Sequence, residues 1–249
     1  MYNDFVFKKE SDFIMINSIF LSLADTLNAT YSILFLILAY LIGSIPFGLV
    51  IGKGICHIDI REHGSKNIGS TNAIRVLGKK VGFLVFFLDV FKGIVVILIV
   101  KILGMTGAWY TPIDPIFYGV SAIIGHSFSI FLKFKGGKAV ATSLGVVFVI
   151  SPLAAILCLI AFYITLKTTG YVSLASTFAT FTVLITVWVL YGCGLEASNF
   201  LEYFINKQTL VTGILVSFMA TLIILKHRKN YIRLLNGTEN SFKKKKENN

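Results

Sequence analysis

The apolar stretch VATSLGVVFVISPLAAILCLIAFYITL, residues 140–166, decides how many times the chain crosses a membrane. It is longer than the roughly 20 residues that one spanning helix requires, and it contains Ser151-Pro152 near its middle. Because proline removes a helix hydrogen bond and its ring clashes with the preceding turn, we expect the helix to break there. Two helices would cross the membrane twice, whereas one kinked helix would place the C-terminal tail outside the cell.

The whole chain has the composition of an integral membrane protein. Of its 249 residues, 55% are hydrophobic and only 14% are charged, and its mean hydropathy is +0.80. This is too apolar for an ordinary soluble domain, and lipid leaves helices as the default structure because it offers the backbone no hydrogen-bond partners. Apolar runs of suitable length lie at 31–51, 83–103, 115–132, 140–166, 172–191 and 209–225.

The formal net charge of +11 comes from three clusters of basic residues in the connections and the tail, not from one soluble face. This distribution argues against a nucleic-acid partner. Because Lys and Arg in short connections favour the cytoplasmic side, we expect all three clusters to face the cytosol. With a break at Pro152, the prediction is an all-α integral membrane protein with about seven transmembrane helices, its N-terminus outside and its C-terminus cytosolic. The clusters are Lys53, Arg61, Lys66, Arg75, Lys79 and Lys80; Lys133, Lys135 and Lys138; and Lys226, Arg228, Lys229, Arg233 and Lys243 to Lys246.

The predicted organisation is one membrane domain at 31–240 with two flanking segments. Residues 1–30 are interpreted as an N-terminal extension at the membrane interface, with translation from Met15 as an alternative. Residues 241–249 are interpreted as a basic disordered tail attracted to anionic lipid. The three cysteines have no paired metal-ligand spacing, so we expect free thiols and no metal site.

The first polar tract, GSKNIGSTNAIRVLGKK at 64–80, resembles a phosphate-binding loop without its lysine. Glycines allow backbone N–H groups to approach an anion, the amides of Asn67 and Asn72 can fix hydroxyl groups, and Arg75 can grip phosphate at two points. The alternative is a polar turn with no ligand.

The second polar tract contains Gly136-Gly137-Lys138 directly before an expected helix, whose first N–H groups have no partner within the helix. This pattern predicts an anion site with a lysine added. The alternative is a glycine turn in a basic membrane anchor.

The third polar tract, KHRKNYIRLLNGTEN at 226–240, places His227 and Asn230 on one helix face, with Glu239 able to orient a nearby cation. The alternative is a basic juxtamembrane helix. Within the membrane, Asp89 and Lys92 have the spacing of a helix-bracing ion pair. Ser173 and Ser176 share a helix face that could contribute a hydroxyl to a site, and ordinary hydrogen bonding between helices is the alternative.

Taken together, these tracts resemble the bacterial membrane glycerol-3-phosphate acyltransferases that use acyl phosphate, the PlsY family. GSIPFG at 43–48 resembles the end of the family's first helix, and its three motifs are matched by DIREHGSKNIGSTNAIRVLG at 59–78, GGKAVAT at 136–142 and HRKNYIRLLNGTE at 227–239. The resemblance covers nearly everything after residue 31. This sequence has Lys66 and Ala139 where glycine is common in the family, and Ser129 where proline is common.

The resemblance implies acyl transfer from a fatty acyl phosphate to the sn-1 hydroxyl of glycerol 3-phosphate, giving lysophosphatidate and inorganic phosphate for phospholipid synthesis. It implies a multi-pass protein of the bacterial inner membrane with a cytosolic active site, contact with membrane lipid, no cofactor or metal, and functional coupling to the enzyme that makes acyl phosphate. The implied catalytic residues are Ser65, Arg75, Lys138, His227 and Asn230, and the implied substrate-binding residues are Gly64, Asn67, Gly69, Thr71, Asn72, Gly136, Gly137, Ser176, Arg228 and Glu239.

Two other functions fit the sequence less well. Thioester-dependent glycerolipid acyltransferases use a His-x4-Asp pair, and no histidine in this sequence has an aspartate five residues later. A transporter for an anionic metabolite would need polar groups near the bilayer midplane, but the conspicuous polar tracts here lie on one side of the expected membrane.

Overall fold

The structure of the protein is a computed structural model that describes residues 2–107, 109, 111–194 and 208–242. All regular elements in this part of the chain are helices, which confirms the predicted all-α class. The predicted tail segment Lys243 to Lys246 lies outside the described residues. The elements are α1 (Tyr2–Ser44), α2 (Phe47–Gly54), α3 (Ser70–Leu77), α4 (Lys79–Met105), α5 (Ile116–Ser127), the 3₁₀ helix η1 (Ile130–Leu132), α6 (Val140–Ile150), α7 (Pro152–Thr169), α8 (Val172–Cys193), α10 (Leu210–Lys226) and α11 (Arg228–Leu235).

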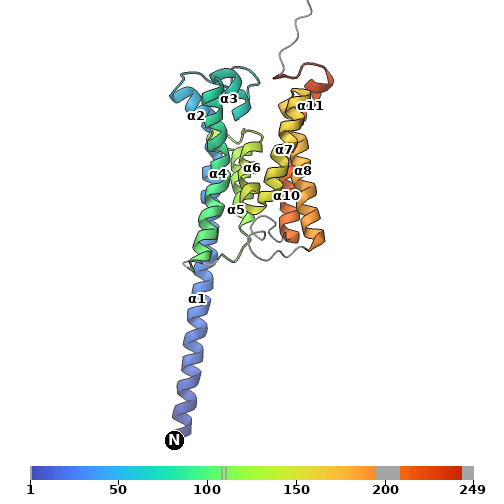
Figure 1. The fold of residues 1–249 in the computed structure, drawn as a ribbon. Coiled ribbons are helices and arrows are strands. Elements are labelled where there is room, and N and C mark those ends of the chain that lie inside the picture. Colours follow the sequence, from blue (N-terminus) through green and yellow to red (C-terminus); the bar gives the residue numbers. More distant parts are fainter. Residues whose placement is uncertain (1, 108, 110, 195–207, 243–249) are drawn as a thin grey trace, which may run out of the picture.

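The helices form two groups that are contiguous in the sequence. In the first group, α5 packs on α1 and α4, while α3 and α6 pack on α4; in the second, α8 packs on both α7 and α10. The two groups stand side by side in Figure 1 and touch where α6 meets α7 and where α5 meets α10. A site at the boundary therefore draws residues from both halves of the sequence.

The predicted break at Ser151-Pro152 is confirmed, and it is the point where the chain passes from the first group to the second. Ser151 has φ −153° and ψ 81°, far from helical values, and Pro152 is the first residue of α7. Proline suits this position because the missing N–H would have no partner in the first turn of a helix. The structure has two helices in this stretch, not the single kinked helix of the alternative.

The two helices run in opposite directions. Residues just before α6 are joined to α11 by the Lys138–Asn230 hydrogen bond, and Gly170, just after α7, accepts a hydrogen bond from the backbone of Phe242. Both contacts lie at one end of the molecule, so α6 leaves that end and α7 returns to it. We call this end, which carries α2, α3 and α11, the polar end.

Within the described residues, four helical segments are long and apolar enough to cross a membrane: Phe20–Ser44, Lys79–Met105, Pro152–Thr169 and Val172–Cys193. A fifth arises if α10 and α11, bent by 48° at their junction, are counted as one span. The segments Ile116–Leu132 and Val140–Ile150 are apolar but shorter. The protein is thus a multi-pass membrane protein, whereas the count of seven crossings and the sides of the two termini stay predictions.

Close backbone contact and a buried ion pair hold the first group together. A Cβ at Gly93 of α4 would overlap the carbonyl oxygen of Thr142 on α6, so only glycine permits this approach. The predicted pair forms, because Lys92 Nζ lies 2.8 Å from Asp89 Oδ1. Lys92 also donates a 2.8 Å hydrogen bond to the carbonyl oxygen of Ile45, where α1 ends. The pair therefore ties α4 to the end of α1.

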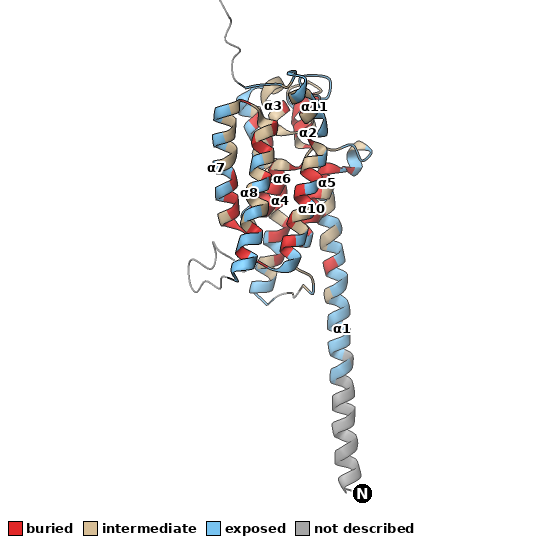
Figure 2. Ribbon diagram, turned by 90° about the vertical axis from the view of Figure 1, so that its right-hand side faces the viewer, coloured by how far each residue is buried: buried red, intermediate tan, exposed pale blue. Residues whose placement is uncertain are grey.

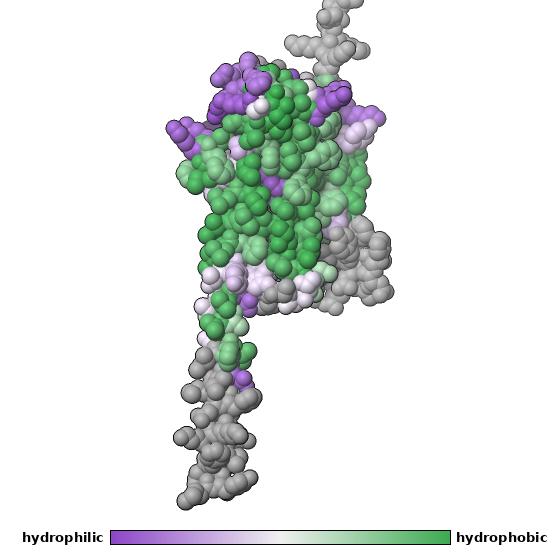
Figure 3. All heavy atoms as spheres, turned by 90° about the vertical axis from the view of Figure 1, so that its left-hand side faces the viewer, coloured by the Kyte–Doolittle hydropathy of each residue, from purple (hydrophilic) through white to green (hydrophobic). Residues whose placement is uncertain are grey.

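The surface matches a protein embedded in lipid. Figure 2 shows buried residues concentrated where the helices face one another. Large apolar side chains such as Phe87 and Phe91 are exposed. Figure 3 shows an apolar band on the body and hydrophilic residues gathered at the polar end. Helix α1 passes through residues 30 and 31 without interruption and extends beyond the body, so the boundary drawn there for an N-terminal extension stays a prediction.

Candidate functional site

The loop that leads into α3 is held by the buried side chain of Asn72. Its Nδ2 donates to the carbonyl oxygens of Ile60 and His63 at 2.8 and 3.2 Å, and its Oδ1 accepts from the Ser65 N–H at 2.7 Å. Gly64 has φ +60°, and a Cβ there would overlap Asn72 Oδ1. Asn72 thus fixes the loop from within, while its predicted contact with substrate stays a prediction.

Helix α3 and the loop before it present a row of polar side chains to one side. Asn67 Oδ1 accepts a 2.9 Å hydrogen bond from the Gly69 N–H, which sets up the start of α3. Arg75, near the end of α3, is partly buried, and its Nη2 donates to the carbonyl oxygen of Asn240 at 3.2 Å. A guanidinium has five N–H donors, so most of the donors of Arg75 remain available to a ligand.

The glycine loop at 136–138 lies against the end of α5. The Gly136 and Gly137 N–H groups donate to the carbonyl oxygens of Ser127 and His126 at 3.2 and 3.0 Å. A Cβ at Gly137 would overlap the His126 ring. These two N–H groups therefore position the loop, and a direct contact of either glycine with substrate stays a prediction.

Lys138 is joined to a relay of polar side chains from the second helix group. Its Nζ donates to Oδ1 of Asn230, and Asn230 Nδ2 donates to Glu239 Oε1 at 2.7 Å. The Glu239 carboxylate also accepts from Arg233 Nε at 2.7 Å and from Ser173 Oγ at 3.1 Å. The relay determines which way the Asn230 amide faces, because its NH₂ must point to the carboxylate and its oxygen to the ammonium.

Burial and hydrogen bonding set the charges of this relay. Burial lowers the pKa of Lys138 to about 8. The negative charge of Glu239 raises this pKa, whereas the positive charges of Arg233 and Arg75 lower it further. Burial alone would raise the pKa of Glu239, but hydrogen bonds from Asn230 and Arg233 outweigh it and hold the pKa below its ordinary value. At neutral pH both groups are mainly charged.

His227 lies at the junction of α10 and α11 with its ring buried. Its Nδ1 is 2.8 Å from the carbonyl oxygen of Ile223. A carbonyl oxygen can only accept, so Nδ1 carries the proton and Nε2 of the neutral ring is left as an acceptor.

These side chains surround one cavity of about 480 Å³ at the polar end, between the two helix groups. A smaller apolar cavity of about 120 Å³ lies deeper, between α6, α7, α8 and α10. Both cavities are lined by Phe86, Val140, Ala141, Phe162 and Ser176. A ligand that fills both would have a polar head among the cations and an apolar part among the helices.

The structure brings most of the predicted site residues to the larger cavity, from all three polar tracts. Gly64, Gly136 and Gly137 support its walls without lining it, and Arg228 is exposed and also outside the lining. The predicted residues that line it are Ser65, Asn67, Gly69, Thr71, Asn72, Arg75, Lys138, Ser176, His227, Asn230 and Glu239.

Several residues that shape the site were not among the expected site residues. The sequence indicates Ser173 only as a hydroxyl that could contribute, and in the structure it lines the cavity and donates a hydrogen bond to Glu239. Phe242 and the buried Asp89 and His126 also line it. Phe242 gave no sequence signal, since it stands alone in a polar tail.

Comparison with known proteins gives one consistent result. The family model described as glycerol-3-phosphate acyltransferase matches residues 33–237. Glycerol-3-phosphate acyltransferase of Acholeplasma laidlawii is 42% identical over 221 residues, covering 86% of this chain and 94% of its own. That of Streptococcus pneumoniae (strain Hungary19A-6) is 42% identical over 209 residues, covering 84% and 92%. The crystal structure of PlsY, an integral membrane glycerol 3-phosphate acyltransferase, in its glycerol 3-phosphate form matches with a TM-score of 0.72 and 38% identity, covering 86% of this chain and 96% of that one.

Proposed function

The chain belongs to the glycerol-3-phosphate acyltransferase family, and from this premise we propose that it uses acyl phosphate as its donor. The proposed reaction transfers the fatty acyl group to the sn-1 hydroxyl of glycerol 3-phosphate and yields lysophosphatidate and inorganic phosphate. The solved PlsY structures are of a glycerol 3-phosphate form and a lysophosphatidic acid form, the proposed acceptor and product.

The observation that carries this proposal is the junction of a cationic cavity with an apolar one. Arg75 and Lys138 line the larger cavity, and the smaller cavity beside it is lined mainly by apolar side chains. Both proposed substrates carry phosphate and one carries a long acyl chain. Such a donor would place its phosphate near the two cations and direct its chain toward the apolar cavity.

The chemistry proposed for the site needs little more than positioning. The sn-1 hydroxyl oxygen attacks the acyl carbonyl carbon, the bond from that carbon to the phosphate oxygen breaks, and phosphate leaves with the electron pair. Because a mixed anhydride already has a good leaving group, a covalent enzyme intermediate is unnecessary. Arg75 and Lys138 would stabilise the negative charge that develops on the leaving phosphate.

The remaining polar groups would orient the acceptor. We assign Ser65 and Asn230 to the substrate oxygens, because both line the cavity and Asn230 is fixed by the relay. His227 Nε2 can accept a hydrogen bond from the attacking hydroxyl. The hydroxyl proton then has two possible acceptors, His227 Nε2 and a phosphate oxygen of the substrate.

The donor is tested with purified enzyme and glycerol 3-phosphate in three parallel assays, with acyl phosphate, acyl-CoA or acyl carrier protein thioester. We expect product only with acyl phosphate, acylated at the sn-1 position, without added metal or cofactor. Comparable rates with a thioester donor, or an sn-2 product, would contradict the proposal.

We also propose that the site faces the cytosol from the bacterial inner membrane, where it would receive donor from the enzyme that makes acyl phosphate. Cysteines introduced singly at positions 66, 135 and 240, in a background without native cysteines, should be shielded from an impermeant external thiol reagent in intact cells. Labelling at all three positions would show that the protein has the opposite orientation in the membrane. Labelling at position 240 alone would rule out the count of seven crossings.

A further inference from the structure

The segment that follows α11 turns back across the polar end. Gly237, with φ +66°, makes the turn, and the Thr238 N–H donates to the carbonyl oxygen of Arg233 at 2.8 Å. At the far end of the segment, the Phe242 N–H donates to the carbonyl oxygen of Gly170, between α7 and α8, at 2.9 Å. We call residues 238–242 the C-terminal strap. All of it lies beyond residue 237, where the match to the family model ends.

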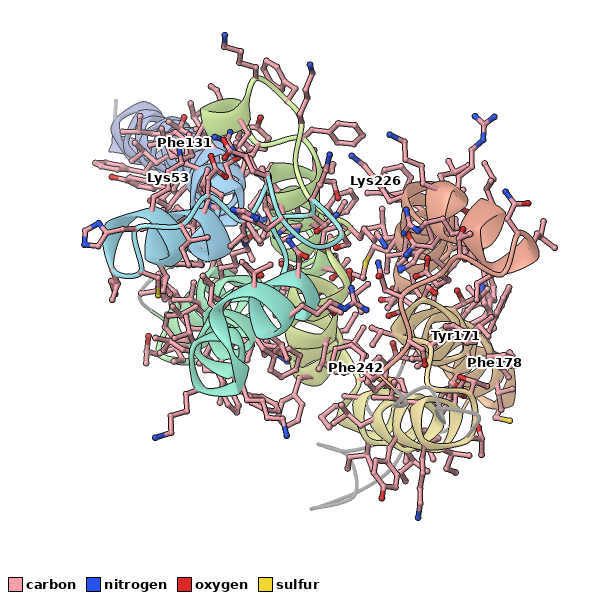
Figure 4. The ribbon with its side chains drawn as sticks, turned by 90° about the horizontal axis from the view of Figure 1, so that it is seen from above. Lys53, Phe131, Tyr171, Phe178, Lys226 and Phe242 are labelled. Carbon is pink, nitrogen blue, oxygen red and sulfur yellow. The ribbon has the colours of Figure 1, made fainter. Side chains whose placement is uncertain are left out.

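The strap also reaches the first helix group through Arg75. The Asn240 carbonyl oxygen accepts from Arg75 Nη2 at 3.2 Å, and the Arg75 guanidinium carbon lies 4.9 Å from the centroid of the Phe242 ring. Arg75 and Phe242 both line the larger cavity. Figure 4, a view onto the polar end, shows Phe242 between the two helix groups. The strap therefore joins the two sides of the cavity mouth.

We propose that Phe242 is a positioning residue that holds the Arg75 guanidinium in place for a substrate phosphate. A cation over an aromatic face is attracted by the ring quadrupole, and a stacked guanidinium keeps the N–H donors on its edge free. A free arginine side chain loses much rotamer entropy when it binds a ligand. An Arg75 side chain that is already held in place loses less entropy on binding phosphate. This inference rests on the proposed function, in which Arg75 binds phosphate.

The Asn240 carbonyl oxygen completes the arrangement. It takes one donor of Arg75, and the described residues provide no further hydrogen-bond acceptor for that side chain. Phe242 thus fixes the plane of the guanidinium, and Asn240 fixes the position of its Nη2. The other N–H donors of Arg75 are left for the ligand.

The test is steady-state kinetics of the full-length enzyme, varying glycerol 3-phosphate and acyl phosphate in turn. We expect Phe242→Ala to raise the KM for the substrate whose phosphate Arg75 contacts by about two- to fivefold, with kcat nearly unchanged. Phe242→Leu, which keeps an apolar bulk without an aromatic face, should behave like Phe242→Ala, whereas Phe242→Trp should retain the native KM. Phe131→Ala is the control, because Phe131 is also exposed at the polar end but lies outside the cavity lining.

A double-mutant cycle separates this inference from the proposed function. In an Arg75→Gln background, Phe242→Ala should cause no further change in KM. The same KM increase in both backgrounds, or a native KM in Phe242→Leu, would overturn the role of Phe242 while the phosphate role of Arg75 stands. Native kinetics in Arg75→Gln itself would instead remove Arg75 from the proposed site, and the inference with it.

Discussion

The loop that leads into α3 and the glycine loop at 136–138 line or support the same cavity, but they are held in different ways. The first is fixed from within by Asn72, which bonds to three residues of that loop. The glycine loop is fixed from outside, by carbonyl oxygens at the end of α5 and by Asn230 of α11. Changes in the first loop should therefore stay local, whereas changes in the distant relay should reach Lys138.

The largest expected effect comes from removing the side chain that the glycine loop presents. Lys138→Ala should lower kcat/KM about ten- to a hundredfold, the equivalent of a charge-assisted hydrogen bond worth roughly 1.5–3 kcal/mol. Lys138→Arg should restore only part of the native kcat/KM, because the larger planar guanidinium cannot take the place of a compact ammonium group. Lys133→Ala is the matched control, since Lys133 is exposed and outside the cavity lining. Equal damage from both alanine variants in steady-state assays would break the comparison.

The next effect is a pH dependence of kcat/KM that we expect from Lys138 in the glycine loop and not from the loop before α3. The pKa of Lys138 is lowered to about 8, so its ammonium is present below that pH and is lost above it. We expect kcat/KM of the native enzyme to fall about tenfold per unit well above pH 8. In Lys138→Arg, which stays charged, this alkaline fall should vanish over the same range. A pH profile that is identical in both enzymes would assign the titration to another group.

A smaller effect should travel through the relay. Glu239→Gln removes the charge that holds the Asn230 amide and Arg233, so Lys138 loses orientation without being touched. We expect kcat/KM to fall about two- to tenfold, the equivalent of one intramolecular hydrogen bond of 0.5–1.5 kcal/mol. Glu62→Gln is the matched control, because Glu62 is exposed, and it should leave kcat/KM unchanged. Native kinetics in Glu239→Gln would mean that Lys138 does not depend on the hydrogen bond from Asn230 to Glu239.

The smallest effect should stay within the first loop and change stability only. Lys66 is exposed with φ +59°, a left-handed conformation that costs a side chain about 1–2 kcal/mol and costs glycine little. Lys66→Gly should raise the free energy of unfolding by about 1 kcal/mol or less, after the entropy that glycine gains in the unfolded chain is deducted. Thermal unfolding measures this effect, and unchanged kcat/KM would show that it remains local.

Sequence reasoning predicted those features that depend on local chemistry. Hydropathy identified the apolar segments, and Pro152 marked the break because proline removes a helix hydrogen bond and its ring clashes with the preceding turn. The Asp89–Lys92 pair followed from helical spacing alone. The convergence of the three polar tracts at one cavity required the family resemblance, because composition gives the side of the membrane and not the distance between connections.

The features that escaped prediction depend on packing between distant segments. Arg75 and Asn240 are 165 positions apart, and nothing in either sequence neighbourhood indicates that they meet. Gly136 and Gly137 were expected to bind substrate, and nothing in their motif indicates that their own N–H groups donate to carbonyl oxygens at the end of α5. A motif shows which donors exist, and only the packed neighbours show which of them remain free.

The contiguity of the two helix groups also has a consequence for biogenesis. Residues up to Ile150 build the first group, and the second begins at Pro152, so the ribosome completes one group before it starts the other. The loop before α3, Arg75 and Lys138 are made early, but Asn230, Glu239 and Phe242 emerge only with the last helix turns and the strap. A nascent or prematurely terminated chain that stops before α11 would carry the cations in the membrane without the groups that contact them. If the proposed function is right, we expect such a chain to lack full activity until α11 and the strap have been made.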